Sequence, residues 1–238
     1  MNKSSAETVY SRWHWLYKIG GAAALFSLAL IPIQLIIFIT WPPPDTASGW
    51  FTLFQDNVLR GLLSFELLFV VNAILGITTT LALYIALRRA NESFMAIALA
   101  LGLVGTMAII AARPVFEMLT LSQQYAAATT DAQRTMFLAA GEMMLAVFNG
   151  TAFHVSYNLA NINLLIIPVV MLQSKRFSKT TAAMGILAGS IGFGLYIPKI
   201  GIFISIFSVL FYAIWYILIA RTLFQLGQGK LDATVHKE

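Results

Sequence analysis

Long hydrophobic stretches alternate with short polar or basic segments along the whole chain. A stretch of about 20 apolar residues forms a helix long enough to cross the hydrocarbon core of a bilayer. The pattern therefore predicts an all-α, polytopic membrane protein, folded as a six-transmembrane-helix bundle. We expect a single transmembrane domain over residues 1–238, with spans at about 19–41, 62–87, 94–114, 152–172, 181–197 and 202–223.

The connection between the third and fourth spans, at about residues 115–150, is helical in character but more polar than the spans. Pro114 predicts a kink at its start, because proline cannot donate the backbone hydrogen bond that continues a helix. Thr129-Thr130-Asp131 supplies an N-cap for a returning helix. Asn149-Gly150-Thr151 predicts a break before the fourth span. We expect an extracytoplasmic helical hairpin between spans three and four.

Composition supports a membrane class. Hydrophobic residues make up 59% of the chain, charged residues only 11%, and the mean hydropathy is +0.80, whereas an average soluble domain has roughly 25% charged residues. The net charge of +5 is explained by topology signals and by anionic lipid headgroups. We therefore predict membrane lipids as partners and no nucleic acid.

Basic residues divide unequally between the two sides of the predicted bundle. Eleven fall on the side that holds both termini and four on or near the other side. Because cytoplasmic loops are enriched in Lys and Arg, both termini are predicted to be cytoplasmic. The eleven are Lys3, Arg12, Lys18, Arg88, Arg89, Lys175, Arg176, Lys179, Arg221, Lys230 and Lys237; the four are Arg60, Arg113, Arg134 and Lys199.

Eight polar side chains in or near the outer halves of the predicted helices are candidates for ligand binding. Such groups are costly in a bilayer unless they pair or face a wet cavity, so each is a functional candidate. Arg113 and Glu117 are four residues apart and share a helix face. His154, Asn158 and Asn161 are spaced four then three and form a polar stripe. The full set is Glu66, Arg113, Glu117, Glu142, Asn149, His154, Asn158 and Asn161.

Two interpretations of these residues remain open. In the structural one, Arg113, Glu117 and Glu142 form an ion-pair network that clamps a bent hairpin, and the polar stripe bonds to neighbouring helices. In the functional one, they line a wet cavity in the outer half of the bundle. There Arg113 holds an anionic group, while Glu66, Glu117 or Glu142 exchanges a proton or binds a cation.

Three functions are consistent with this pattern. The first is a non-enzymatic protein that binds or translocates a small polar, lipidic or amphipathic molecule. The second is an intramembrane enzyme that acts on a lipid or small molecule through Glu117, Glu142 or His154. The third is a structural or regulatory membrane subunit.

The sequence leaves open whether the protein is an enzyme, which ligand it takes and which oligomeric state it adopts. No HExxH, GxSxG, Walker or dinucleotide motif occurs. The chain contains no cysteine, which excludes disulfides, iron–sulfur clusters and thiolate metal sites. We predict no metal site and no cofactor.

In layout and size the chain resembles a family of uncharacterised bacterial six-span membrane proteins, each with a domain of unknown function. The shared features are an outer loop after the first span, a long outer helical connection at about 115–150, and a tight turn at Pro198-Lys199. The resemblance is architectural and carries no catalytic residues. It implies a multi-pass protein of the bacterial inner (plasma) membrane.

Overall fold

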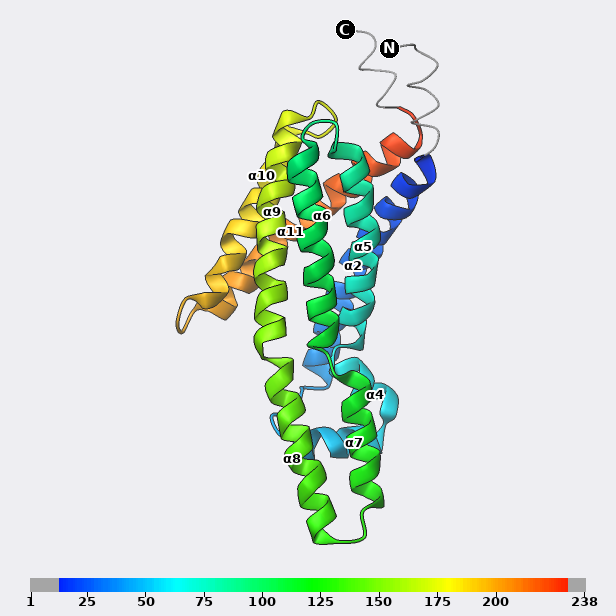
Figure 1. Cartoon of the computed structure of the whole chain (residues 1–238), viewed down its shortest axis with the longest axis vertical. Helices are drawn as coiled ribbons and strands as arrows, with labels where there is room; N and C mark the ends of the chain where they lie inside the picture. Colours follow the sequence, from blue (N-terminus) through cyan, green and yellow to red (C-terminus); the bar gives the residue numbers. More distant parts are fainter. Residues whose placement is uncertain (1–12, 231–238) are drawn as a thin grey trace. The chain divides into compact units, whose positions relative to one another are not determined.

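The computed structural model describes residues 13–230, and no β-strand occurs in this range (Figure 1). The expected all-α class is therefore confirmed. Predictions for Lys3, Arg12, Lys237 and the placement of the two termini lie outside the described residues. In chain order the elements are α2 (His14–Thr40), α3 (Ala47–Asp56), α4 (Val58–Ser64), α5 (Leu67–Leu87), α6 (Glu92–Ala111), α7 (Val115–Ala127), α8 (Asp131–Phe148), α9 (Thr151–Gln173), α10 (Lys179–Gly192), the 3-10 helix η1 (Phe193–Tyr196) and α11 (Gly201–Gly227).

Five helical segments in the described range are long and apolar enough to cross a membrane. They are His14–Thr40, Leu67–Leu87, Glu92–Ala127, Asp131–Gln173 and Gly201–Gly227. The segment expected as the fifth span forms α10, which has 14 residues, and the short helix η1. At a rise of 1.5 Å per residue, α10 alone is about 21 Å long, shorter than the roughly 30 Å hydrocarbon core.

Contacts between residues divide the chain into two compact units. Unit 1 comprises Met1–Leu28, Ile74–Gly105 and Asn158–Glu238; unit 2 comprises Ala29–Ala73 and Thr106–Tyr157. The boundaries fall within α2, α5, α6 and α9. Each unit has its own buried hydrophobic core.

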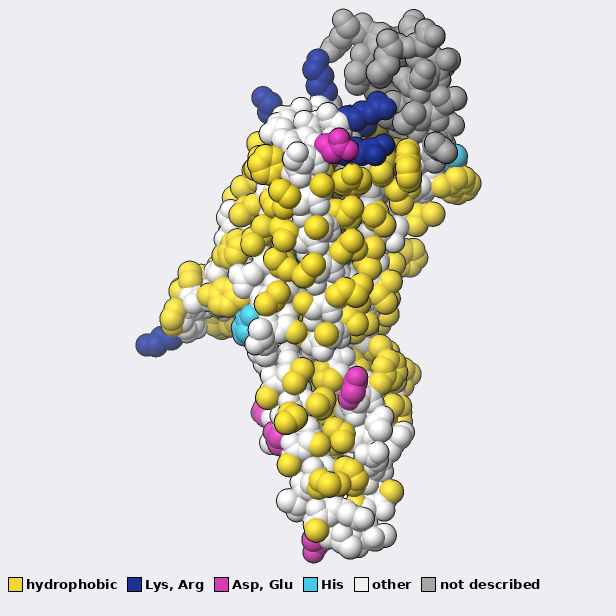
Figure 2. Space-filling view, in the orientation of Figure 1, with side chains coloured by type: hydrophobic (Ala, Val, Ile, Leu, Met, Phe, Trp, Pro, Cys, Tyr) yellow, Lys and Arg dark blue, Asp and Glu magenta, His cyan; other side chains and the backbone are white. Residues whose placement is uncertain are grey.

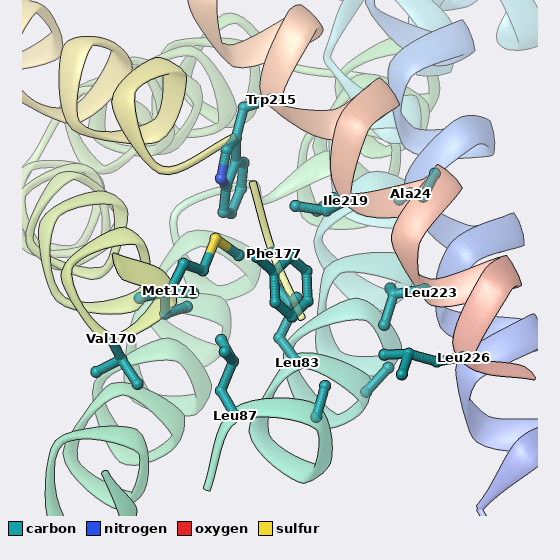
Figure 3. Close-up of a cluster of buried hydrophobic side chains, with 14 of the residues drawn as sticks. Ala24, Leu83, Leu87, Val170, Met171, Phe177, Trp215, Ile219, Leu223 and Leu226 are labelled. Carbon is teal, nitrogen blue, oxygen red and sulfur yellow. The ribbon is translucent and has the colours of Figure 1, made fainter. Parts of the chain in front are cut away.

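The core of unit 1 is a cluster of aliphatic and aromatic side chains from α2, α5, α6, α9, α10 and α11 (Figure 3). Leu83 and Leu87 of α5 and Leu223 of α11 are buried in this cluster. Phe177, from the α9–α10 connection, enters the same cluster. Because lipid tails are as apolar as these side chains, the cluster stabilises the unit through close packing more than through removal from water.

Glycines let α10 pack closely against its neighbours in unit 1. A Cβ added at Gly189 would lie 3.0 Å from the backbone oxygen of Asn161, and one at Gly185 would lie 2.4 Å from Cγ of Pro168. Both neighbours belong to α9. Small residues at such contacts allow helix backbones to approach in a membrane protein. α10 also packs along α11.

Basic side chains occupy the α5–α6 and α9–α10 connections of unit 1. Arg88 and Arg89 precede α6, and Lys175 and Arg176 follow α9. Nη1 of Arg176 donates a 3.2 Å hydrogen bond to the carbonyl of Ala86, which ties the α9–α10 connection to the last turn of α5. Figure 2 shows dark blue side chains gathered over this end of the unit.

The core of unit 2 is aromatic. Trp50 and Phe54 of α3 are buried with Phe65, and the rings of Trp50 and Phe65 meet edge to face with centroids 4.7 Å apart. Edge-to-face pairs bring the positive edge of one ring to the negative face of the other. α7 and α8 lie side by side, and α3 crosses them (Figure 1).

Three local predictions for residues 115–150 are confirmed. α6 and α7 are separated at Pro114. The Thr130 hydroxyl accepts a 3.3 Å hydrogen bond from the backbone N–H of Gln133, and the two residues form a capping box at the start of α8. α8 and α9 are separated at Asn149 and Gly150.

The second predicted span differs from the structure. Residues 62–87 are expected to form one continuous helix, but α4 ends at Ser64 and α5 begins at Leu67. Between them Glu66 has a φ of 65°. This left-handed backbone costs a residue with a side chain about 1–2 kcal/mol. Other contacts of Glu66 must offset that cost.

Candidate functional site

Arg113 forms an ion pair with Glu66 in unit 2. Nε of Arg113 donates a hydrogen bond of 2.5 Å to Oε2 of Glu66. The two side chains are only 4% and 18% exposed. Helical spacing predicts Glu117 as the partner of Arg113, and the structure corrects this. The helix stops at Pro114, so the four-residue relationship across it is lost.

The remaining surface of the Arg113 guanidinium is covered by carbonyls and aromatic rings of unit 2. Nη1 donates hydrogen bonds to the carbonyls of Ala112 (3.2 Å) and Phe148 (3.1 Å). The guanidinium carbon lies 4.1 Å from the ring centroid of Phe148, 5.2 Å from Phe153 and 5.4 Å from Phe69. Cation–π attraction is strongest where water is excluded, so these rings stabilise the buried charge.

Three helix interruptions of unit 2 meet at this guanidinium. Arg113 itself lies in the interruption between α6 and α7, and Glu66 lies in the one between α4 and α5. The carbonyl of Phe148 belongs to the last residue of α8, and Phe153 lies in the first turn of α9. One side chain therefore ties together the ends of six helices. Its hydrogen bonds satisfy backbone groups that the interruptions leave without helical partners.

Glu142 bonds to the start of α3. Its Oε1 accepts a 2.9 Å hydrogen bond from the backbone N–H of Ala47, the first residue of α3. A carboxylate is favourable at this end of a helix, because the N–H groups carry partial positive charge. Gly141 allows the approach, since a Cβ there would lie 2.8 Å from Cζ of Phe51. Glu142 thus anchors α3 to α8.

The three other predicted residues of unit 2 are exposed. Glu117 is exposed on the first turn of α7. Asn149 is exposed at the C-terminal cap of α8. His154 is exposed, with its ring 5.2 Å from that of Phe153. Among residues 13–230 no group of three or more His, Asp or Glu side chains could hold a metal ion.

Asn158 and Asn161 belong to unit 1. Nδ2 of Asn158 donates a 2.7 Å hydrogen bond to the hydroxyl of Tyr196 in η1. Asn161 is 5% exposed and lies against α10, where a Cβ added at Gly192 would come within 2.2 Å of its Oδ1. Asn158 therefore bonds to η1, and Asn161 packs against α10 within the same unit.

Chemically, the Arg113 environment is an anion-binding site whose anion is Glu66. A guanidinium presents a planar set of donors that matches carboxylate and phosphate oxygens. Sequence reasoning identified both charges but not their pairing, nor the three phenylalanines around them. The only sequence signal for these rings is that Phe148 and Phe153 flank the predicted break at Asn149 and Gly150.

Comparison with protein families confirms the expected membership of an uncharacterised family. A family model described as "Domain of unknown function (DUF4386)" matches residues 15–226. The match spans most of the chain, so the protein belongs to this family. No curated protein and no solved structure matches it.

Proposed function

We propose that this DUF4386 protein binds or translocates a small polar, lipidic or amphipathic molecule in the membrane, and that the Arg113–Glu66 pair controls its binding site. The observation that carries the proposal is the meeting of three helix interruptions at one buried charge pair. Interrupted helices at membrane depth are tolerated where they are buried in protein or line a wet cavity. In many transporters such interruptions form the substrate site.

Glu66 acts in this proposal as an internal substitute for the ligand. Its carboxylate occupies the donor Nε of Arg113, which is the chemistry that a ligand carboxylate or phosphate would use. A ligand with such a group competes with Glu66 for the guanidinium. The exchange releases the α4–α5 interruption from α6 and α7, which couples ligand binding to a change in helix arrangement.

The full chain, reconstituted into liposomes and incubated with a bacterial metabolite and lipid extract, tests the proposal. Bound and internalised molecules are identified by mass spectrometry against empty liposomes. We expect one chemical class to be enriched, and its enrichment to change about tenfold in Glu66→Gln. Glu117→Gln removes a carboxylate of the same type from an exposed position and is the matched control. No enrichment over empty liposomes, or equal effects of both variants, contradicts the proposal.

The topology proposed with this function has six spans, with α10 and η1 together forming the fifth, in the bacterial plasma membrane. The α7–α8 hairpin is extracytoplasmic and both termini are cytoplasmic. This assignment is supported by the basic residues of the α5–α6 and α9–α10 connections, since such residues favour the cytoplasmic side.

Single cysteines test the topology cleanly, because the chain has none of its own. A membrane-impermeant maleimide should label Thr129→Cys, at the α7–α8 turn, in intact cells. It should label Asn91→Cys, at the α5–α6 connection, only after the cells are permeabilised. The opposite pattern would reverse the proposed orientation.

A further inference from the structure

Arg60 of unit 2 carries a charge that the described chain does not neutralise. Within residues 13–230 its guanidinium has no carboxylate partner, and its buried Nε has no hydrogen-bond partner. The guanidinium carbon lies 5.0 Å from the ring centroid of Trp41, the residue that follows α2. The ring fixes the position of the charge but supplies no acceptor for its donors.

Two further buried polar atoms make no hydrogen bond within the described chain, one on α4 and one on α2. Ser64 is 2% exposed, and its hydroxyl makes no hydrogen bond within the described chain. It is four residues after Arg60 on α4, so the two side chains share a helix face. Gln34 of α2 donates through Nε2 to the carbonyl of Leu63 at 3.2 Å, while its buried Oε1 has no partner. Native proteins rarely leave buried polar atoms unpaired, so the donors of Arg60 and Ser64 are available to a polar group from outside the described chain.

Exposed apolar side chains lie near Arg60 on α2 and α4, as expected for a surface that contacts lipid. Leu59, beside Arg60 on α4, is 62% exposed, and Ile36 and Ile39 on the last turns of α2 are 62% and 72% exposed. Trp41 lies two residues after Ile39, and tryptophan is enriched where a membrane helix reaches the headgroup layer. A basic, hydrogen-bonding group thus lies beside exposed apolar side chains, which matches the headgroup and acyl chains of one amphipathic molecule.

We propose that Arg60, Ser64 and Trp41 form a binding site for the phosphate headgroup of an anionic phospholipid. The phosphate accepts hydrogen bonds from Arg60 and Ser64. The acyl chains lie along Ile36, Ile39 and Leu59. The site is separate from the Arg113–Glu66 pair, and it stands whether or not that pair binds a ligand.

Native mass spectrometry of the full chain in detergent tests the site with added phosphatidylglycerol, phosphatidylcholine or inorganic phosphate. We expect phosphatidylglycerol to bind in preference to phosphatidylcholine and to resist displacement by excess inorganic phosphate. Arg60→Gln should lower its affinity about tenfold, because hydrogen bonds to charged groups are the stronger ones. Arg134→Gln, which removes an exposed positive charge from α8 of the same unit, should change it less than twofold.

Equal affinities in Arg60→Gln and Arg134→Gln would overturn the proposal. Displacement by inorganic phosphate would overturn it in favour of a soluble anion. Equal affinity for phosphatidylcholine would also overturn it, because the site would then not distinguish anionic from zwitterionic headgroups. Ser64→Ala decides the question if Arg60→Gln does not fold. Loss of one hydroxyl should lower phosphatidylglycerol affinity about fivefold, and unchanged affinity would overturn the site.

Discussion

The carboxylate of Glu66 reaches Nε of Arg113 across 47 positions of sequence, and it does so from a backbone with a φ of 65°. Glu66 thus combines an unfavourable backbone conformation with a side chain that belongs to a buried ion pair. The backbone conformation ends α4 and turns the side chain toward the guanidinium. The ion pair in turn offsets the cost of that conformation, so neither feature is explained without the other.

Arg113→Met should strongly destabilise the protein. Removing one partner of a buried ion pair leaves the other charge uncompensated, which costs about 3–5 kcal/mol, and here the carbonyls of Ala112 and Phe148 also lose their donor. Equilibrium unfolding in mixed detergent micelles measures the change. Arg134→Met, on the exposed face of α8, is the control and should stay within about 0.5 kcal/mol of the unsubstituted protein. Equal stability of the two variants would show that Arg113 is not a structural centre.

Glu66→Gln should lower stability by about 1–3 kcal/mol, because it keeps the shape of the side chain but removes the charge that pairs with Arg113. Glu117→Gln should have almost no effect, because Glu117 is exposed on α7. The thermal unfolding midpoints of the two variants, measured in the same detergent, give the comparison. If Glu117→Gln proved the more damaging change, the pairing of Arg113 described above would be incorrect.

Glu142→Ala should lower stability by about 1 kcal/mol, as expected for losing a side-chain cap at a helix N-terminus. The backbone N–H of Ala47 loses its acceptor in this variant. Hydrogen exchange should rise at the first turn of α3 before it rises in α7 or α8. Uniform exchange over all three helices would instead indicate that Glu142 stabilises the unit as a whole.

Gly189→Ala should destabilise unit 1 by about 1–3 kcal/mol, because overpacking forces backbone shifts and the nearest atoms of α9 include the carbonyl oxygen of Asn161. Gly76 is the matched control. No atom lies within 4 Å of a Cβ added there. Gly76→Ala should therefore stabilise α5 by about 0.5–1 kcal/mol, the usual gain in a helix interior. A lower thermal unfolding midpoint for Gly189→Ala and a higher one for Gly76→Ala would support the close contact of α9 and α10.

Helix ends that depend on local chemistry could be predicted from the sequence. Pro114 cannot continue a helix, Thr129-Thr130-Asp131 offers an N-cap, and Asn149-Gly150 favours a break. The structure has an interruption or a cap at each place. These signals act within a few residues, so they do not require knowledge of the fold.

The interruption at Glu66 could not be predicted in this way. Residues 64–67 contain no proline or glycine, and a run of this hydrophobicity favours a continuous helix. The break depends on Arg113, which is distant in sequence. The pairing of Arg113 with Glu66 cannot be predicted for the same reason, because 47 positions separate the two residues. The four-residue spacing from Arg113 to Glu117 gives no pair, because the helix is interrupted at Pro114.

Position 66 must satisfy two requirements at once, and few amino acids meet both. Glycine accepts the left-handed backbone but carries no charge, glutamine keeps the length but not the charge, and aspartate keeps the charge on a side chain shorter by one methylene group. A family member without an acidic residue at this position would leave the buried guanidinium uncompensated. Positions 66 and 113 should therefore vary together among related chains, as one inherited pair.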